Sequence, residues 1–261
     1  MVNTFNRAES LRHCLTGYLC QTVKAFEVVI ADDGSTDHTK EVIQEFSDKA
    51  PFPIRHVRHD HEGHRRASIL NKGISECSAP IILFTDCDSI PMNDLLQVHL
   101  QFDAKDKMLC GGYIRLTEKE TDEITPPFIL QGQYEEFLTP ERKRRLRRRH
   151  LKDLLYRALW KSGRPTNIGL NYSVRREHLD KINGYDEQFK GWGGADEDVR
   201  RRLQMVGVSP KSIWTQAVVL HQYHKAEPSK NITVRKKNQD LARRENVSAY
   251  CLDGIKKQES A

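Results

Sequence analysis

Short apolar runs alternate with helix-like segments along residues 1–112, and this alternation constrains the fold more than any other feature of the chain. Apolar spacing predicts strands at 26–31, 54–57 and 81–85, with amphipathic helices before, between and after them. Strands that alternate with helices favour a mostly parallel sheet covered by helices on its faces. We therefore expect an α/β fold of the Rossmann-like, doubly wound kind.

Pairs of carboxylates end two of these strands, Asp32 with Asp33 and Asp86 with Asp88. In such a sheet ligands bind at the carboxyl ends of the strands. Residues i and i+2 of a strand share a face, so the carboxylates of Asp86 and Asp88 would lie about 5–7 Å apart. At about 5 Å they would repel by roughly 3 kcal/mol, which favours a bound Mg²⁺ or Mn²⁺ over a solvated strand end. Asp32 and Asp33 are equally compatible with a helix cap and with a nucleobase contact.

Three further segments carry residues that could bind a ligand or take part in catalysis. HDHEGH (59–64) favours an exposed loop, with a zinc site as the alternative. GWGGADED (191–198) is either a turn before an acidic helix start or a functional loop. In the second case its glycines admit a ligand, its indole packs on a sugar and a carboxylate is the base. His221 and His224 end the last predicted strand, where they are either polar strand-end residues or metal ligands.

The basic run at 142–149 belongs to a predicted amphipathic helix with leucines at helical spacing. A solvated face is one interpretation and an anionic membrane surface is the other. Nucleic acid is disfavoured, because no aromatic residues interleave the run. The net charge of +6 is compatible with each of these partners.

Localisation is expected to be cytoplasmic, with peripheral attachment at the inner face of the membrane. The segment MVNTFNRAESL has no apolar signal core, and the sequence contains no apolar run of membrane-spanning length. The scattered cysteines are expected to be reduced.

Taken in order, the motifs resemble family-2 glycosyltransferases of the GT-A fold. They are NTFNRAESL, EVVIADDGSTD, GHRRASILNKGI, FTDCDSIP, GLNYSVRREHLDKINGYDEQFKGWGGADEDVRRRLQMVG and LHQYH. The second half is also similar to the C-terminal module of β-1,4-galactosyltransferases and of bacterial chondroitin-type polymerases. Three departures stand out: few apolar residues precede Asn3, Asn3 replaces the family's usual Pro, and Ala195 stands where Glu is common.

The resemblance implies a role for each matching position. Asp196 would be the catalytic base, with Glu197 or Asp198 sharing that task. Asp88 would bind the metal with His221, or alternatively His224, and with Asp86, which also holds the ribose. Donor-binding residues would be Thr4, Phe5, Asn6, Asp32, Asp33 (to uracil), Arg65, Asp86, Gly169 and Asn171. Acceptor-binding residues would be Trp192, Gly193, Gly194 and Glu197.

The resulting hypothesis is a Mn²⁺- or Mg²⁺-dependent, inverting transferase that moves a sugar from a nucleotide-sugar donor, expected to be UDP-linked. The acceptor would be a glycan, a lipid-linked sugar or a protein. A nucleotidyltransferase, a metallohydrolase built on 59–64 and a non-catalytic adaptor acting through 142–149 are the alternatives. Residues 1–112 would form the nucleotide-sugar half, 113–229 the acceptor half of the same domain, and 230–261 a basic tail.

Overall fold

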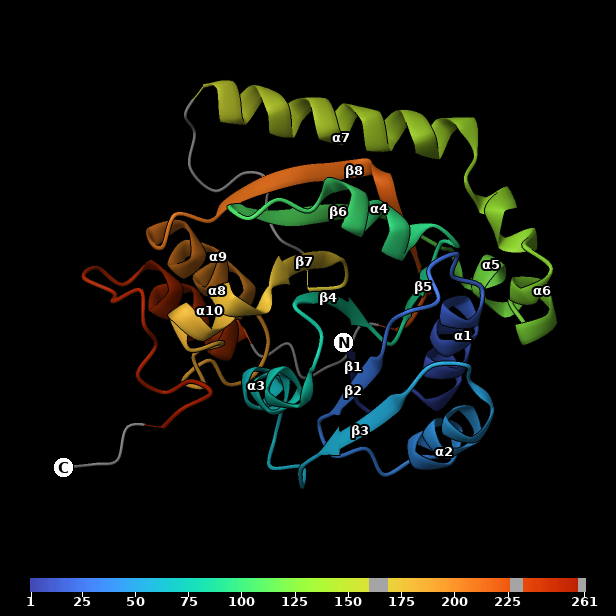
Figure 1. Ribbon diagram of the computed structural model, residues 1–261, viewed down its shortest axis with the longest axis horizontal. Helices are drawn as coiled ribbons and strands as arrows, with labels where there is room; N and C mark the ends of the chain where they lie inside the picture. Colours follow the sequence, from blue (N-terminus) through green and yellow to red (C-terminus); the bar gives the residue numbers. More distant parts are fainter. Residues whose placement is uncertain (160–168, 226–231, 258–261) are drawn as a thin grey trace.

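The structure is a computed structural model that describes residues 1–159, 169–225 and 232–257. It is built on an eight-stranded sheet, shown in Figure 1. In spatial order the strands are β3 (Ile54–Arg58), β2 (Val28–Asp32), β1 (Val2–Thr4), β4 (Ile81–Asp86), β7 (Tyr172–Arg175), β6 (Lys107–Arg115), β8 (Ser209–His221) and β5 (Ser89–Pro91). The first four run parallel, as does the β6–β8 pair, whereas β7 and β5 are antiparallel to their neighbours. The mostly parallel α/β sheet expected from the sequence is confirmed.

The helices cover both faces of the sheet. They are α1 (Ala8–Leu19), α2 (Thr39–Lys49), α3 (Arg66–Glu76), α4 (Leu95–Phe102), α5 (Glu118–Asp122), α6 (Pro126–Leu130), α7 (Pro140–Ala158), α8 (Arg176–Ile182), α9 (Ala195–Met205) and α10 (Ile232–Arg243), with a 3₁₀ turn, η1, at Gln133–Phe137. The short helices α5 and α6 lie between β6 and α7.

Strand β2 shows why the parallel part of the sheet is central. All of its residues are buried, and they alternate between two apolar clusters. Val28 and Ile30 pack with α1 and α2, whereas Val29 and Ala31 pack with α3, α8 and α9. A period of two with apolar residues on both faces is what a strand covered by helices on each side requires.

The parallel register brings several strand ends to one place. Thr4 pairs with Asp32, Asn3 pairs with Asp86, and Asp32 pairs with Arg58. On the other side of the sheet, Ser89 pairs with His221. The carboxyl ends of β1, β2, β4 and β8 therefore converge on one edge, where ligands bind in such sheets.

Helix α7 lies across the outer side of β8 and β6, along the top of Figure 1. Its buried face carries Leu146, and His150 contacts the Ser212 hydroxyl at 3.0 Å. The guanidinium of Arg149 lies 4.9 Å from the centroid of the Trp214 ring. The helix itself was predicted correctly, but the leucines at helical spacing are not its buried face. Leu151, Leu154, Leu155 and Leu159 are exposed instead.

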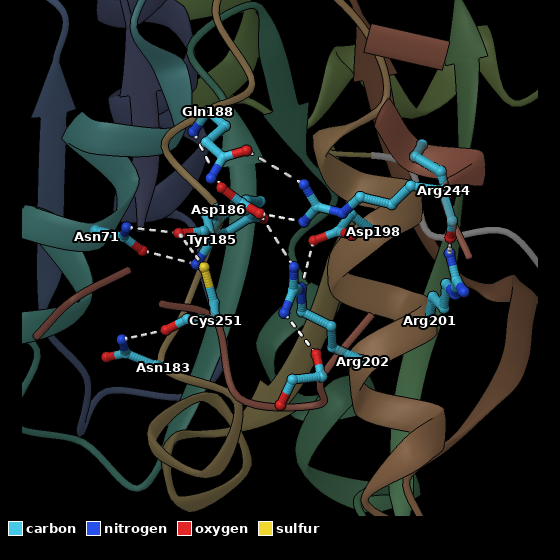
Figure 2. A network of polar contacts seen from close by, with 12 residues as sticks. Asn71, Asn183, Tyr185, Asp186, Gln188, Asp198, Arg201, Arg202, Arg244 and Cys251 are labelled. Carbon is cyan, nitrogen blue, oxygen red and sulfur yellow. Dashed lines mark hydrogen bonds and ion pairs between the residues drawn. The ribbon is translucent and has the colours of Figure 1, made fainter. Parts of the chain in front are cut away.

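Residues 232–257 lie against α9 and the end of α8, and polar contacts hold them there (Figure 2). Arg202 of α9 binds Asp198 and Asp186, and Arg244 at the end of α10 also binds Asp186. The side chain of Asn183, which has a left-handed backbone (φ 62°), donates to the Cys251 carbonyl at 2.6 Å. Within the described ranges, no helix is long and apolar enough to span a membrane.

Candidate active site

A cavity of about 810 Å³ opens at the edge where these strand ends meet. The ends of β1, β4 and β8 form one part of its wall, and the first turns of α3 and α9 form another. Residues from opposite ends of the sequence line it together, among them Thr4, Asp86, Asp196 and His221. Most of the candidate residues of the sequence motifs therefore lie in a single site.

Three residues of the cavity lining, Asp88, His221 and His224, bring one ligand atom each to within 4.8 Å of one another. The Nε2 atoms of His221 and His224 lie 3.8 and 3.4 Å from the Asp88 carboxylate. The β5–β8 register creates this cluster, because it places Asp88, which precedes β5, beside the end of β8. The amide of Gln222 donates to the Asp88 carbonyl at 2.8 Å and holds the two segments together.

The hydrogen bonds of the two histidines fit a metal site. Nδ1 of His221 lies 2.9 Å from the Gln222 carbonyl, and Nδ1 of His224 lies 3.1 Å from the Lys225 carbonyl. A carbonyl only accepts, so each Nδ1 carries a proton, and in the neutral form of each ring the Nε2 lone pair faces Asp88 and can coordinate a cation. The buried Oδ1 of Asp88 has no hydrogen-bond partner among the described residues. Lone pairs that face a carboxylate favour a cation between them, and one oxygen with two nitrogens suits Mn²⁺ better than Mg²⁺.

Arg66, the first residue of α3, lines the cavity and pairs with two of its acids. Its guanidinium lies 3.1 Å from Asp196 and 3.4 Å from Asp86, and only 16% of its side chain is exposed. Burial alone would lower the pKa of Arg66, but the carboxylates of Asp196 and Asp86 raise it well above its ordinary value. Arg66 thus remains a fixed positive charge between the two acids.

The Asp196 carboxylate is held from two sides through the same oxygen. Oδ1 accepts from Arg66 and, at 3.3 Å, from the Tyr185 hydroxyl. Burial and the nearby Asp196 charge raise the pKa of Tyr185, so this hydroxyl stays protonated and donates. Such contacts hold the carboxylate in one orientation, as a general base requires.

Two glycines leave room for this arrangement. A Cβ on Gly169 would lie 2.3 Å from an Arg66 nitrogen and 3.0 Å from Asp196 Oδ2. Gly194, which caps the start of α9, has φ 88°, and a Cβ there would meet the Asn238 carbonyl at 2.8 Å. Side chains at these positions would displace the guanidinium or the loop that leads into Asp196.

Most of the predicted site residues line this cavity. They are Thr4, Phe5, Asp86, Asp88, Gly169, Trp192, Gly193, Gly194, Asp196, Glu197, His221 and His224. The two histidines were alternatives in the sequence, and the structure brings both to Asp88. Asp198 was a second candidate for the base, but it is buried and bound to Arg202 at 2.6 Å, outside the cavity wall. Asp198 therefore forms a structural ion pair with Arg202.

Asp32 and Asp33 do not belong to the described lining of the cavity. Asp32 accepts from the amide and hydroxyl of Ser35 and from His56, and it closes the turn after β2. Asp33 contacts His59 Nε2 at 2.5 Å through one oxygen and accepts from the Arg65 amide at 3.0 Å through the other. The uracil contact of Asp33 stays a prediction, and it would require one of these partners to move.

Three more predicted residues, Arg65, Asn6 and Asn171, are not part of the cavity lining. The side chain of Arg65 binds the Asp60 carbonyl and Glu62. Asn6 directly precedes Arg7, the N-cap residue of α1, and its Oδ1 accepts from the Thr36 amide at 2.7 Å.

Asn171, the third, is completely buried. Its amide donates to the carbonyls of Gly112 and Ala217, which joins β7 to β6 and β8. Its Oδ1 accepts from His99 at 3.0 Å. Every polar atom of the Asn171 side chain is thus engaged with the protein.

The histidines of 59–64 do not form a metal site in the described structure. The Asp88 group alone brings three ligand atoms together there. His59 is buried against Asp33, whereas residues 60–63 are exposed, so the expected exposed loop is confirmed only for its middle. His61 stacks on Phe5 with centroids 4.3 Å apart.

Sequence reasoning missed two residues of the cavity wall, Arg66 and Arg200, and also the buried Tyr185, which contacts Asp196. Arg66 follows Arg65 directly, and only the start of α3 decides which of the two faces the cavity. Arg200 follows Asp196 by four residues, and this helical spacing could have indicated a shared face.

Comparison with known proteins identifies two family models along the chain. The model described as glycosyl transferase family 2 matches residues 1–182, more than two thirds of the sequence. The model described as N-terminal domain of galactosyltransferase matches residues 149–225.

Two curated relatives cover most of this chain. Validoxylamine A glucosyltransferase of Streptomyces hygroscopicus subsp. jinggangensis is 28% identical over 89% of this chain and 57% of its own length. Chondroitin synthase of Escherichia coli is 26% identical over 90% of this chain and 37% of its own length. The chain thus spans less than two thirds of either relative.

Solved structures share the fold at low identity. The mannosyltransferase PcManGT of Pyrobaculum calidifontis, in complex with GDP-Man and Mn²⁺, has a TM-score of 0.58 and 18% identity over 84% of this chain and 55% of its own. Staphylococcus aureus TarS 1–349 in complex with UDP-GlcNAc has a TM-score of 0.55 and 13% identity over 88% of this chain and 59% of its own.

Proposed function

The chain belongs to glycosyl transferase family 2, and we propose that it is a metal-dependent, inverting enzyme that moves a sugar from a nucleotide-sugar donor to an acceptor hydroxyl. The observation that carries this proposal is the single cavity that holds both Asp88 with its two histidines and the oriented Asp196. One group suits the diphosphate of a donor, and the other suits the hydroxyl of an acceptor.

Asp88, His221 and His224 would hold the cation, because their geometry and proton positions fit one. A divalent cation bound there supplies positive charge that stabilises the departing nucleoside diphosphate. Asp86 would hold the ribose beside it, and Arg66 would fix the position of Asp86 through their ion pair.

Asp196 would accept the proton of the acceptor hydroxyl as that oxygen bonds to the anomeric carbon. The bond from this carbon to the phosphate oxygen breaks on the opposite face, and its electron pair leaves with the diphosphate. A single displacement of this kind inverts the anomeric configuration. Trp192, 45% exposed at the cavity wall, offers an aromatic surface for the acceptor sugar.

The donor is proposed to be UDP-linked, on the resemblance of the Asp32–Asp33 and Asp86–Asp88 motifs to family members. The named similar structures hold UDP-GlcNAc in one case and GDP-Man in another, so the test must include both nucleotides. A glycan acceptor is favoured, since the curated relatives include a chondroitin synthase.

The experiment is a thermal-shift screen of nucleotide sugars with and without Mn²⁺, followed by detection of the released nucleoside diphosphate. A ligand at 100 times its Kd adds about 2.7 kcal/mol, which raises Tm by roughly 5–10 °C in a protein of this size. We expect a Mn²⁺-dependent shift with a UDP-sugar. Release of pyrophosphate instead would identify a nucleotidyltransferase, and a shift with GDP-sugars alone would overturn the UDP assignment.

We also propose that α7 docks on an anionic membrane surface. Arg144, Arg145, Arg147 and Arg148 are exposed, and Leu151, Leu154, Leu155 and Leu159 form an exposed apolar stripe on the following turns. Helices that combine basic residues with an apolar face partition into the interface of anionic bilayers. The buried face of α7 is anchored on β8, so its outer face is presented as a fixed surface.

A further inference from the structure

Two arginines of α9 lie two residues apart, both are buried, and they differ sharply in their partners. Arg202 is 2% exposed and is bound by Asp198, by Asp186 and by the Ser248 carbonyl, as Figure 2 shows for the two acids. Its charge is therefore fully compensated inside the protein.

Arg200 is 6% exposed, yet its charge has almost no compensation. Its guanidinium donates to the neutral side chain of Gln204 at 3.0 Å, and its Nε has no hydrogen-bond partner among the described residues. The one carboxylate within ion-pair distance in that part of the chain is Glu197, which lies 3.9 Å away and is 63% exposed. Burial lowers the pKa of Arg200, a further sign of a poorly solvated charge.

A buried cation without a good partner costs free energy, and an anionic ligand bound beside it would remove part of that cost. Arg200 lines the same cavity as Asp196 and follows it by one helical turn, so the two side chains share a face of α9. Leu170 and Glu197 line the cavity beside them. Asp88 and its histidines, by contrast, lie at the end of β8.

We propose that Arg200 forms an anion-binding subsite for the acceptor, so that the natural acceptor carries a carboxylate or a phosphate close to the hydroxyl that is glycosylated. This inference rests on the proposed transferase function and on Asp196 as its base. The acceptor anion replaces the partner that the fold does not supply, which makes acceptor binding selective for charge.

The first experiment measures binding without turnover, in the presence of UDP and Mn²⁺. The probes are methyl β-glucoside, methyl β-glucuronide and methyl β-glucoside 6-phosphate, titrated into the wild-type chain, Arg200→Met and Arg200→Lys. We expect the wild type to bind one of the two anionic probes at least about 30-fold more tightly than the glucoside. This factor is the smallest loss of affinity expected when one partner of a buried charge pair is removed. The two anionic probes distinguish carboxylate from phosphate recognition.

Arg200→Met should abolish this preference, and Arg200→Lys should retain part of it, because lysine keeps the charge but not the planar geometry. Equal affinity of the wild type for the glucoside and both anionic probes would overturn the proposal. So would an Arg200→Met variant whose main defect is in UDP binding, because Arg200 would then serve the donor.

A second measurement separates this role from a structural one. Arg200→Met should leave Tm unchanged or raise it, because the variant removes an uncompensated buried charge. Arg202→Met is the matched control and should lower Tm by about 5 °C or more, because it leaves the buried Asp198 without its arginine and removes one of the two arginines that bind Asp186. An equal loss of Tm in Arg200→Met would show that Arg200 supports the fold and would overturn the proposal.

Failure of this inference can be told apart from failure of the proposed function. Metal-dependent binding of a nucleotide sugar together with a preference for neutral acceptors would refute the anion subsite alone. Absence of binding by every nucleotide sugar would refute the transferase function, and the inference would fail with it.

Discussion

Arg66 and Asp196 form an ion pair of 3.1 Å that joins the first turn of α3 to the first turn of α9. The two residues are 130 positions apart in the sequence, and the same guanidinium also reaches Asp86 at the end of β4. One buried cation therefore connects the part of the cavity proposed to bind the donor with the part proposed to activate the acceptor.

Replacing Arg66 by Met should lower transfer by at least about 10-fold and cost about 1–3 kcal/mol of stability, because two partly buried acids lose their shared partner. Gly169→Ala is a milder companion, since the new Cβ would lie 2.3 Å from the guanidinium and push it aside without removing its charge. It should lower kcat while retaining the charge of the cavity. Steady-state kinetics and thermal melts measure both effects, and unchanged kcat in both variants would contradict this role of Arg66.

Removing any one of Asp88, His221 and His224 should abolish or strongly weaken Mn²⁺ binding. Each residue supplies one of the three clustered ligand atoms. Loss of a residue that only supports a metal ligand typically weakens metal binding by about 10- to 100-fold, so alanine in place of a ligand should weaken Mn²⁺ binding by at least as much. The Mn²⁺-dependent rise in Tm with UDP present is the measurement. If His221→Ala binds Mn²⁺ like the wild type, the site uses His224 without it, and the three-residue assignment is wrong.

Asp196→Asn should preserve binding of the donor and lower kcat by about 10²- to 10⁴-fold, the usual contribution of a general base. Asparagine keeps the hydrogen bond from Arg66 but cannot take a proton. Glu197→Gln is the control, because Glu197 lines the same wall but is largely exposed. It should change KM for the acceptor more than kcat, and a larger kcat loss in Glu197→Gln would reassign the base.

His99 should make folding stability sensitive to pH between about 4 and 6.5. Burial lowers its pKa to about 4, although the hydrogen bond to Asn171 opposes this shift. The unfolded chain binds the proton below pH 6.5 whereas the folded chain does not, so stability falls as pH drops from 6.5 to 4. The loss is about 3 kcal/mol. Urea unfolding of the wild type and His99→Gln across this range tests it, and an identical pH slope in the two would disprove it.

Neutralising Arg144, Arg145, Arg147 and Arg148 with glutamine should weaken binding to vesicles of phosphatidylcholine and phosphatidylglycerol. Each basic residue near such a surface contributes about 1 kcal/mol, so the variant should partition roughly 10²- to 10³-fold less. The control replaces the exposed Lys40, Lys72, Lys236 and Lys237 with glutamine, which changes the net charge by the same amount outside α7. This control should bind the vesicles far better than the α7 variant. Equal losses in the two variants would show that net charge alone, and not α7, drives binding.

Much of the fold could be predicted from local patterns. The buried alternation of β2 and the carboxylates that end β2 and β4 are local features, and a parallel sheet necessarily gathers such strand ends at one edge. Asp196 does not end a strand, and only motif order and resemblance could place it in one site with Asp86 and Asp88.

The sequence by itself therefore determined the fold class and the kinds of side chain available for the site. The tertiary structure decided which of these side chains face the cavity and which partners they contact. The pairing of Ser89 with His221 brings both histidines to Asp88, and the start of α3 turns Arg66 inward and Arg65 outward. Likewise, Arg200 and Arg202 are the same residue type on one helix, but the acids that meet Arg202 include Asp186, brought there from another segment. Long-range register and helix phase set these contacts, and neither is encoded within a single motif.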